Sequence, residues 1–210
     1  MQVNHKIQKN RDIDMARKNL TREGIIEATM ALIDEKGSSS NVNFREIARA
    51  IGCAHTSIYN LFPSYSELLY ETSKAIMLNM RMQLMAQSRQ HVIDGTYENP
   101  VIAYIGCVAR FALDHRGWYR FLWMDYFEVD LRQIFKDQPR PELLLLDLYL
   151  ETCGNRISAE EGATRLSIGH GYLHGELCKY LLARNQVTDE QAFINHLLEQ
   201  VRWLLGYNIN

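Results

Sequence analysis

The 210-residue sequence has little proline, little cysteine and no long uncharged apolar run. Four prolines and twelve glycines favour long helices over a β fold with many turns. The four cysteines lie far apart and form no CxxC pair, which indicates neither a disulfide framework nor a zinc site. No run approaches the roughly eighteen apolar residues of a membrane-spanning helix, and residues 1–20 lack the apolar core of a signal peptide. We therefore expect a cytoplasmic protein with no membrane association.

A strong excess of charge of one sign is also absent. The formal net charge is −2, with a slight positive excess in residues 1–70 and a slight negative excess in residues 71–210. Any binding of nucleic acid must therefore come from the placement of individual basic side chains and not from a strongly basic domain. Composition alone leaves the function class open.

Helical periodicity dominates the chain, and its start and stop signals are explicit. Thr21 precedes an apolar-periodic segment that Gly37 ends, and Asn43 followed by Glu46 is a cap for a second, short helix. Together such signals predict helices over residues 22–36, 44–50, 54–61, 65–90, 100–116, 142–152, 159–184 and 189–205, with further helical pieces within 118–134. We expect an all-α protein in which an N-terminal unit of three helices joins a larger helical domain through a long fourth helix.

The first part of this pattern, a short helix, a glycine turn and a second short helix, has the form of a helix-turn-helix. Apolar side chains can form a small core between the helices. His55, Thr56, Ser57, Tyr59 and Asn60 then remain available on the outside. Hydroxyls and amides of this kind can bond phosphate oxygens or base edges in the major groove. A packed aromatic ring is the alternative for Tyr59, whereas His55, Thr56 and Asn60 have no evident packing role.

The stretch F-R-E-I-A-R-A-I-G-C-A-H-T-S-I-Y-N-L-F-P-S-Y-S-E-L-L resembles the DNA-binding signature of the TetR family of transcriptional regulators. The similarity runs from about Thr21 to Leu69. It implies that the start of the second helix contacts the DNA backbone or a base, that the third helix opens onto the groove, and that later residues reach phosphates or bases. The positions implied are Asn43, Arg45, Ala54, His55, Thr56, Ser57, Tyr59, Asn60 and Tyr65.

Three positions depart from the family pattern. Ala54 stands where a serine often caps the recognition helix, Leu61 replaces a common His or Tyr, and Tyr65 replaces a lysine that usually meets a phosphate. Loss of that lysine removes one ionic contact and its salt-dependent affinity. We hypothesise that a basic arm, residues 1–16, compensates. Unchanged operator affinity and salt dependence after deletion of the arm would refute this.

The resemblance further implies a DNA-binding domain over residues 17–70 and a helical effector-binding and dimerisation domain over residues 71–210. An aromatic cluster in residues 118–127 could line an apolar cavity for a small apolar or aromatic effector, or it could fill a core. The expected effector-binding residues are Met77, Tyr104, Phe111, Trp118, Trp123, Tyr126, His170 and His174.

His170, His174 and Cys178 lie at i, i+4 and i+8, roughly on one helix face. That spacing could supply metal ligands. However, a straight helix turns such positions progressively apart, no fourth ligand is evident nearby, and the Gly171-x-x-x-Gly175 pattern indicates close helix packing instead. We therefore favour a histidine that lines the effector cavity, and we expect no metal and no cofactor.

The last two predicted helices carry broad apolar faces, which suit a four-helix interface between two copies of the chain. Packing onto the same domain is the alternative. A dimer is favoured because one helix-turn-helix reads too little DNA, and two-fold symmetry matches a palindromic operator. The expected dimer contacts are Tyr172, Leu181, Leu197, Val201 and Leu204.

These features predict a homodimeric, ligand-responsive transcriptional regulator that binds double-stranded operator DNA, most simply a repressor released by its effector. The main alternative is a helical enzyme with a His/Cys centre around residues 170–178, and a second is a helical adaptor that binds protein. Neither has support beyond residue types, because the sequence has no nucleophile elbow, phosphate loop or H-E-x-x-H motif. We therefore expect no catalytic residues.

Overall fold

Helices supply all the regular structure in the part of the chain that this computed structural model describes, residues 20–126, 141–154, 156–185 and 187–207. The prediction of an all-α fold is therefore confirmed. Those ranges contain, in chain order, α2 (Arg22–Lys36), the 3₁₀ turn η1 (Ser39–Asn41), α3 (Phe44–Ile51), α4 (His55–Ile58), α5 (Tyr65–Ile93), α6 (Pro100–Asp114), α7 (Arg116–Trp123), α9 (Pro141–Thr152), α10 (Ala159–Leu181) and α11 (Glu190–Leu204).

Caps that depend on neighbouring residues form as the sequence predicts. The Asn43 side chain accepts hydrogen bonds from the backbone N–H groups of Arg45 and Glu46, and Ser64 accepts one from Glu67 at the start of α5. Gly52 ends α3 with φ 79°, a left-handed conformation that favours glycine.

Several helix boundaries differ from prediction: α5 continues to Ile93, α10 ends at Leu181, and three further boundaries also differ. The residue that caps α11 is Asp189, which accepts from the N–H of Ala192, and not Thr188. The expected helix over 100–116 ends at Asp114, because His115 has a non-helical backbone that separates α6 from α7. The third helix is shorter than predicted, since α4 ends at Ile58 and residues 59–61 form a turn.

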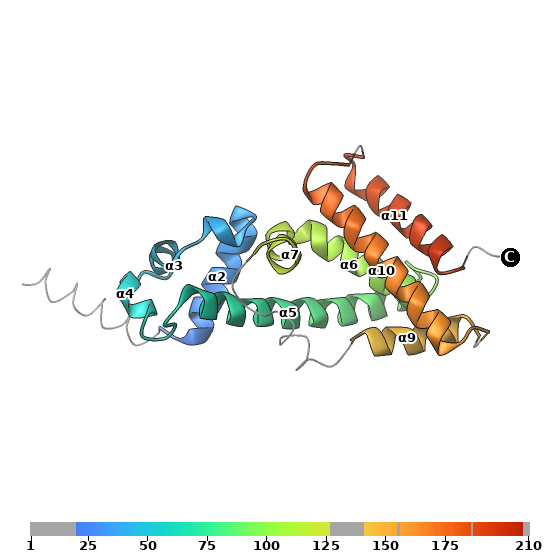
Figure 1. Ribbon diagram of the computed structural model, residues 1–210, viewed down its shortest axis with the longest axis horizontal. Coiled ribbons are helices and arrows are strands. Elements are labelled where there is room, and N and C mark those ends of the chain that lie inside the picture. The colour runs from blue at the N-terminus through green and yellow to red at the C-terminus, as the bar shows by residue number, and fades with distance from the viewer. Residues whose placement is uncertain (1–19, 127–140, 155, 186, 208–210) are drawn as a thin grey trace, which may run out of the picture.

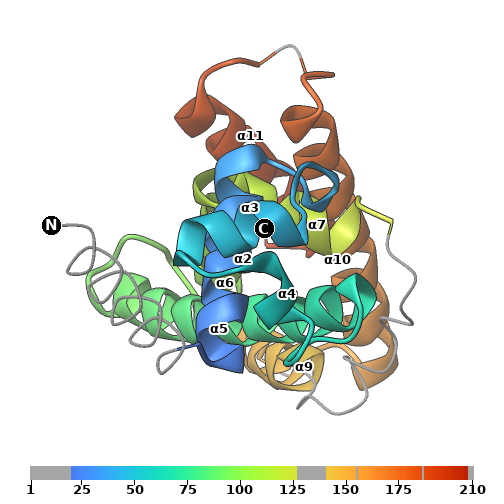
Figure 2. The same cartoon turned by 90° about the vertical axis from the view of Figure 1, so that its left-hand side faces the viewer.

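Figure 1 shows α5 running along the molecule, with α2, α3 and α4 at one end and α9, α10 and α11 at the other. Seen from the first end, α3 and α4 lie in front of the remaining helices (Figure 2). The helix-turn-helix is thus presented at one extremity of the molecule, and the long α5 joins it to the rest.

Two buried clusters divide the packing between these ends. The N-terminal core is built from α2 to α5 and also takes in Phe121 and Leu122 from α7. The C-terminal core is built mainly from α6, α9, α10 and α11. Along α5, Ile76 belongs to the first core, whereas Met80 and Leu84 pack with α6 in a third, smaller cluster. Along α5 the packing therefore changes from the N-terminal core to the third cluster between residues 76 and 80, and the domain boundary expected near residue 70 stays a prediction.

Candidate nucleic-acid interface and effector cavity

The helix-turn-helix is shaped by a well-capped α3 and a poorly capped α4. Asn43 Oδ1 lies 3.0 Å from the backbone nitrogen of Arg45 and 3.2 Å from that of Glu46, so this oxygen is committed to the start of α3. Ala54 occupies the cap position of α4 and supplies no side-chain hydrogen bond. The methyl side chain of Ala54 cannot accept a hydrogen bond, so α4 lacks the side-chain cap that a serine would supply.

The outer surface of α4 and the following turn carries polar side chains. His55, Thr56 and Asn60 are exposed, and Ser57 is half-buried. Tyr59 is 50% exposed, and its ring packs edge-on against Phe44 with centroids 4.7 Å apart. The Tyr59 ring therefore packs while the side chain remains accessible, and its contact with DNA stays a prediction.

Basic side chains border this surface on α3. Arg45 and Arg49 are both exposed and lie four residues apart, which puts them on one face of the helix. Sequence reasoning selected Arg45 and missed Arg49, although the i, i+4 spacing was a usable signal. Lys36 forms a salt bridge with Glu46. The hydrogen bond between them holds the pKa of Glu46 below its ordinary value.

Arg22, a residue of α2, holds the turn that follows α4 against α2 and α5. Its guanidinium donates to the carbonyl oxygen of Leu61 and to Glu67 Oε1, 3.0 Å away. The same group lies over the ring of Phe62, 4.1 Å from its centroid. The turn after α4 is therefore held by three kinds of contact, which orients the polar surface as a unit.

The Tyr65 side chain forms hydrogen bonds within the protein. Its hydroxyl donates to the carbonyl oxygens of Val42, at 2.8 Å, and Ser39, at 3.1 Å. Burial raises the pKa of this phenol well above its ordinary value. The tyrosine at the family's lysine position thus braces the segment between α2 and α3, and its role at DNA stays a prediction.

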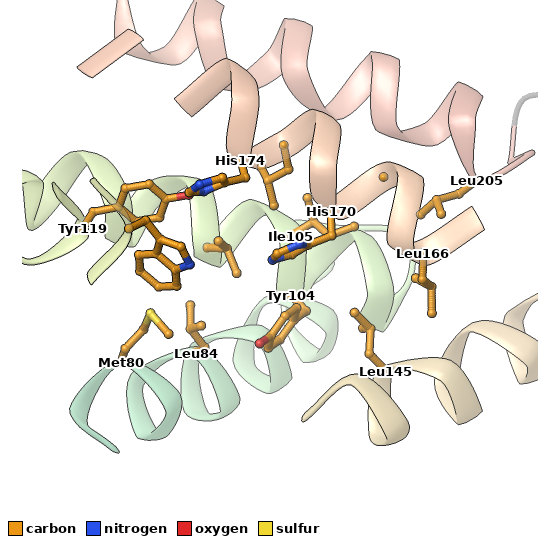
Figure 3. A pocket seen from close by; sticks show the side chains of 14 residues that line it. Met80, Leu84, Tyr104, Ile105, Tyr119, Leu145, Leu166, His170, His174 and Leu205 are labelled. Atoms are coloured by element: carbon orange, nitrogen blue, oxygen red, sulfur yellow. The ribbon is translucent and has the colours of Figure 1, made fainter. Parts of the chain in front are cut away.

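A cavity of about 90 Å³ lies between α5, α6, α7, α9 and α10 at the other end of the molecule. Figure 3 shows Tyr119 and His174 toward one side, Leu145, Leu166 and Leu205 toward the other, and Tyr104 and His170 between them. Among the described residues it is lined by Met80, Leu84, Tyr104, Ile105, Val108, Tyr119, Trp123, Leu145, Leu166, Gly169, His170, Leu173, His174 and Leu205.

Four of the eight expected effector-binding residues line this cavity: Tyr104, Trp123, His170 and His174. The other four lie elsewhere. Met77 and Phe111 pack in the small cluster between α5 and α6, and Trp118 donates its indole N–H to the carbonyl oxygen of Met30, 2.8 Å away.

Tyr126, the last of the eight, is 90% exposed after the end of α7 and does not reach the cavity. Among the residues missed was Tyr119, which lies four residues before Trp123 and hence on the same face of α7. That spacing could have identified it, whereas apolar residues such as Leu145 and Leu205 carry no signal that separates cavity from core.

A hydrogen-bonded chain crosses the aromatic side of the cavity. Tyr119 Oη lies 2.8 Å from His174 Nδ1, and His174 Nε2 lies 3.6 Å from Cys178 Sγ. Burial, with a smaller contribution from His170, lowers the pKa of His174, while burial raises the pKa values of Tyr119 and Cys178. All three groups are therefore held in their uncharged forms at neutral pH.

This arrangement bears on the metal and enzyme alternatives. In the described ranges, no group of three or more His, Cys, Asp or Glu side chains is placed to hold a metal ion. A raised thiol pKa keeps Cys178 protonated, which is the opposite of what a cysteine nucleophile requires.

Residues 25–72 match the family model described as bacterial regulatory proteins, tetR family. This segment, called the TetR-family domain below, is therefore similar to the regulatory proteins of that family. A curated relative, an uncharacterised helix-turn-helix transcriptional regulator of Haemophilus influenzae, is 36% identical over 78 residues, which are 37% of this chain and 38% of that protein. The chain thus matches well under half the length of this relative.

Solved structures extend the likeness of the fold beyond the TetR-family domain. A TetR transcriptional regulator from Rhodococcus sp. RHA1 has a TM-score of 0.53 and 19% identity, covering 94% of this chain and 99% of that one. RolR in complex with its ligand resorcinol has a TM-score of 0.53 and 17% identity, covering 96% and 98%. At these identities the likeness concerns the fold.

Helix α7 connects the TetR-family domain to the cavity. Its residues Tyr119 and Trp123 line the cavity, whereas Phe121 and Leu122 are buried in the N-terminal core. At its start, Gly117 packs directly on the end of α2, and its backbone N–H donates to Asp34 Oδ1 at 3.2 Å. One short helix therefore contacts both the cavity and the core of the TetR-family domain.

A carboxylate just after α7 adds a second tie. Asp125 Oδ2 accepts from the hydroxyl of Ser38 at 3.0 Å, and from the backbone N–H and hydroxyl of Ser39 at 2.7 and 2.8 Å. These serines stand between α2 and α3, next to the carbonyl oxygens bound by Tyr65. A displacement of the end of α7 would thus act on the base of the helix-turn-helix.

The structure places two of the expected dimer residues inside the chain's own core. Leu197 and Val201 on α11 are fully buried against other elements of the same chain, so neither side chain is available to a second copy. Tyr172 and Leu181 are partly buried against that core. The apolar side chains that do remain exposed on α10 and α11 are Ile168, 54% exposed, and Trp203, 66% exposed.

No helix in the described part of the chain has both the length and the apolar character needed to cross a bilayer.

Proposed function

We propose that the protein is a homodimeric transcriptional regulator that binds a palindromic operator as a repressor and is released by a small apolar or aromatic effector. The observation that carries this proposal is the position of α7, which contributes to the cavity and to the core of the TetR-family domain. RolR, which shares the fold, is described with the ligand resorcinol, and this supports a ligand-responsive function.

The DNA-binding part of the proposal rests on the exposed polar surface of α4 and the basic side chains of α3. His55, Thr56 and Asn60 are exposed and would reach base edges or phosphates, and the exposed Arg45 and Arg49 would meet phosphates. Because the turn behind them is fixed by Arg22, this surface would dock as one rigid unit.

The proposed ligand response depends on two contacts, that of Gly117 in α7 with α2 and that of Asp125, just after α7, with the serines before α3. A ligand that fits the cavity better when Tyr119 or Trp123 has moved would displace α7, and Gly117 and Asp125 would pass the displacement to α2 and to the serines before α3. In a dimer this changes the separation of the two recognition surfaces, which then no longer match successive major grooves. Such a ligand acts only through unequal affinity for the two states.

Two glycines support a dimer through α10. Gly171 and Gly175 are exposed, and a Cβ added at either position would meet nothing within 4 Å in the described chain. A glycine inside a helix costs about 1 kcal/mol relative to alanine, and here the chain's own packing does not require it. Close approach of a second copy along α10, where Ile168 is also exposed, would account for both glycines.

The dimer is tested by sedimentation velocity of a Gly171→Leu variant, with Ala31→Leu as the control. Ala31 is an exposed helical residue on α2, far from α10 along the molecule. We expect the parent and the control to sediment as dimers and Gly171→Leu as a folded monomer. A parent chain that sediments as a monomer at micromolar concentration contradicts the proposal.

The DNA-binding function is tested by selection of bound duplexes from a random pool with the full chain. We expect enrichment of an inverted repeat and salt-dependent affinity for it, lost in a His55→Ala, Asn60→Ala double variant. His196→Ala on α11 is the matched control, because His196 is exposed and lies outside the TetR-family domain. Absence of any enriched sequence would refute the regulatory function.

A further inference from the structure

The cavity has two chemically different sides. Its aliphatic side is formed by leucines from α9 and α10 and by Leu205, which follows α11. Its polar side is formed by Tyr104, Tyr119, His170 and His174 (Figure 3). A ligand that satisfies both sides needs an apolar body and at least one hydrogen-bonding group.

The hydrogen-bonding groups on the polar side differ in how far they are already engaged. Tyr119 and His174 bond each other at 2.8 Å, and His174 is also in reach of Cys178. His170 is exposed at the edge of the cavity, its ring parallel to that of His174 at 6.4 Å between centroids. No hydrogen bond of its ring nitrogens to another described residue is present, and Figure 3 shows the ring directed into the cavity. His170 is therefore the group best placed to bond a ligand.

The charge of the lining residues and the size of the cavity restrict the class of ligand further. None of the described lining residues is a Lys, Arg, Asp or Glu, so within these residues an ion in the cavity would meet no opposite charge. Burying an unpaired ion costs several kcal/mol in proteins. An apolar cavity of about 150 Å³, engineered in T4 lysozyme, accommodates benzene, so a cavity of about 90 Å³ has room for one ring at most, with some side-chain adjustment.

We propose that the cavity binds an uncharged single-ring molecule that carries a hydroxyl group, and that the imidazole of His170 bonds this hydroxyl. The inference rests on the regulatory function proposed above and names the ligand class of the same cavity. The imidazole suits a hydroxyl because a neutral ring offers one donor and one acceptor nitrogen, and a hydroxyl can use either. The ring of the ligand would occupy the space between Trp123 and the leucines.

The test is isothermal titration of the full chain at pH 7 with five single-ring probes: phenol, cyclohexanol, toluene, benzoate and benzylammonium. We expect phenol or cyclohexanol to bind with one site per chain. Toluene should bind about threefold more weakly, since it lacks one hydrogen bond. Benzoate and benzylammonium should bind at least about tenfold more weakly, since each carries a charge into the cavity.

Two variants locate the contact. In His170→Ala the difference between phenol and toluene should vanish while the affinity for toluene stays within about twofold, because only the hydroxyl loses its partner. In the control His196→Ala both affinities and their difference should be unchanged. Because His170 is exposed and helical, the alanine variant is expected to fold, which thermal unfolding by circular dichroism verifies.

Each of three outcomes overturns the proposal. The first is a charged probe that binds as tightly as phenol, and the second is a preference for the hydroxyl that survives in His170→Ala. The third is the absence of binding by both phenol and cyclohexanol up to their solubility limits. Operator binding without ligand is measured separately on the selected duplex. If it persists while the titration fails, only the ligand class is wrong, and if no duplex is selected, the regulatory function fails independently of the titration.

Discussion

Replacing Gly117 by alanine probes the packing between the TetR-family domain and the rest of the chain. A Cβ at this position would lie 2.5 Å from the Cα of Asp34 and 2.8 Å from its carbonyl oxygen, and closer still to the carbonyl oxygen of Ile33. These are backbone atoms, so no rotamer change can relieve the overlap. Helices α2 and α7 would have to separate by about 1 Å to restore ordinary contacts of about 3.5 Å.

The expected cost follows from that overlap. Overpacking a tight site typically costs 1–3 kcal/mol, and the backbone contact puts Gly117 toward the upper end. The better helix propensity of alanine returns up to about 1 kcal/mol. The net loss in the free energy of unfolding is therefore about 2 kcal/mol, which lowers Tm by roughly 4–8 °C in a chain of this size.

Thermal unfolding followed by circular dichroism at 222 nm measures this loss. The matched control is Gly162→Ala on α10, a buried helical glycine whose nearest neighbours are the ends of the Leu146 and Leu150 side chains at 3.0 Å. Leucine ends can move, so the control should melt within about 2 °C of the parent. If Gly117→Ala melts as high as the control, the close contact of α7 with α2 does not make the expected contribution to the free energy of unfolding.

Further predictions concern the two sites and their connection. Arg45→Ala and Arg49→Ala should each reduce the slope of log affinity against log salt for the operator by about one unit, measured by fluorescence anisotropy of a labelled duplex. Equal slopes in parent and variants would show that neither arginine meets a phosphate. Asp125→Ala should leave ligand affinity within twofold while the ligand-induced loss of operator affinity shrinks at least about threefold, with the exposed Asp114→Ala as control. An undiminished ligand effect would remove Asp125 from the connection. Because burial lowers the pKa of His174, protonation favours the unfolded chain, so this contribution to stability is complete above pH 6.5 and declines as the pH falls below it. Tm should therefore drop less between pH 7 and pH 5 in His174→Gln than in the parent, and an equal drop would contradict the assignment.

Local signals made the helix-turn-helix predictable from the sequence. The capping amide of Asn43, the left-handed Gly52 and the Ser64 cap act on residues within a few positions, so each boundary can be read without knowledge of the fold. The exposed positions of α4 follow from the same pattern, because the apolar residues between them must face inward.

The cavity could be predicted only in part, because tertiary contacts decide it. Phe111 and Trp118 have the same apolar character as Trp123, and only the packing of α6 and α7 sends the first two into the protein and the third into the cavity. Leu197 and Val201 likewise look suited to a dimer interface, and the chain covers them itself. Asp125 finds its partners 86 and 87 residues away, a distance at which sequence pattern carries no information.

Because α7 contributes side chains both to the cavity and to the N-terminal core, the choice of residues matters when the ligand specificity of this protein is to be changed. Substitutions at Tyr119 or Trp123 would alter recognition and response together, since both lie on the helix that touches the TetR-family domain. Leu145 and Leu166, on α9 and α10, line the cavity from the far side and do not belong to the N-terminal core. Under the proposed function, libraries directed at these leucines should change which molecule binds while the effect of binding on operator affinity stays that of the parent.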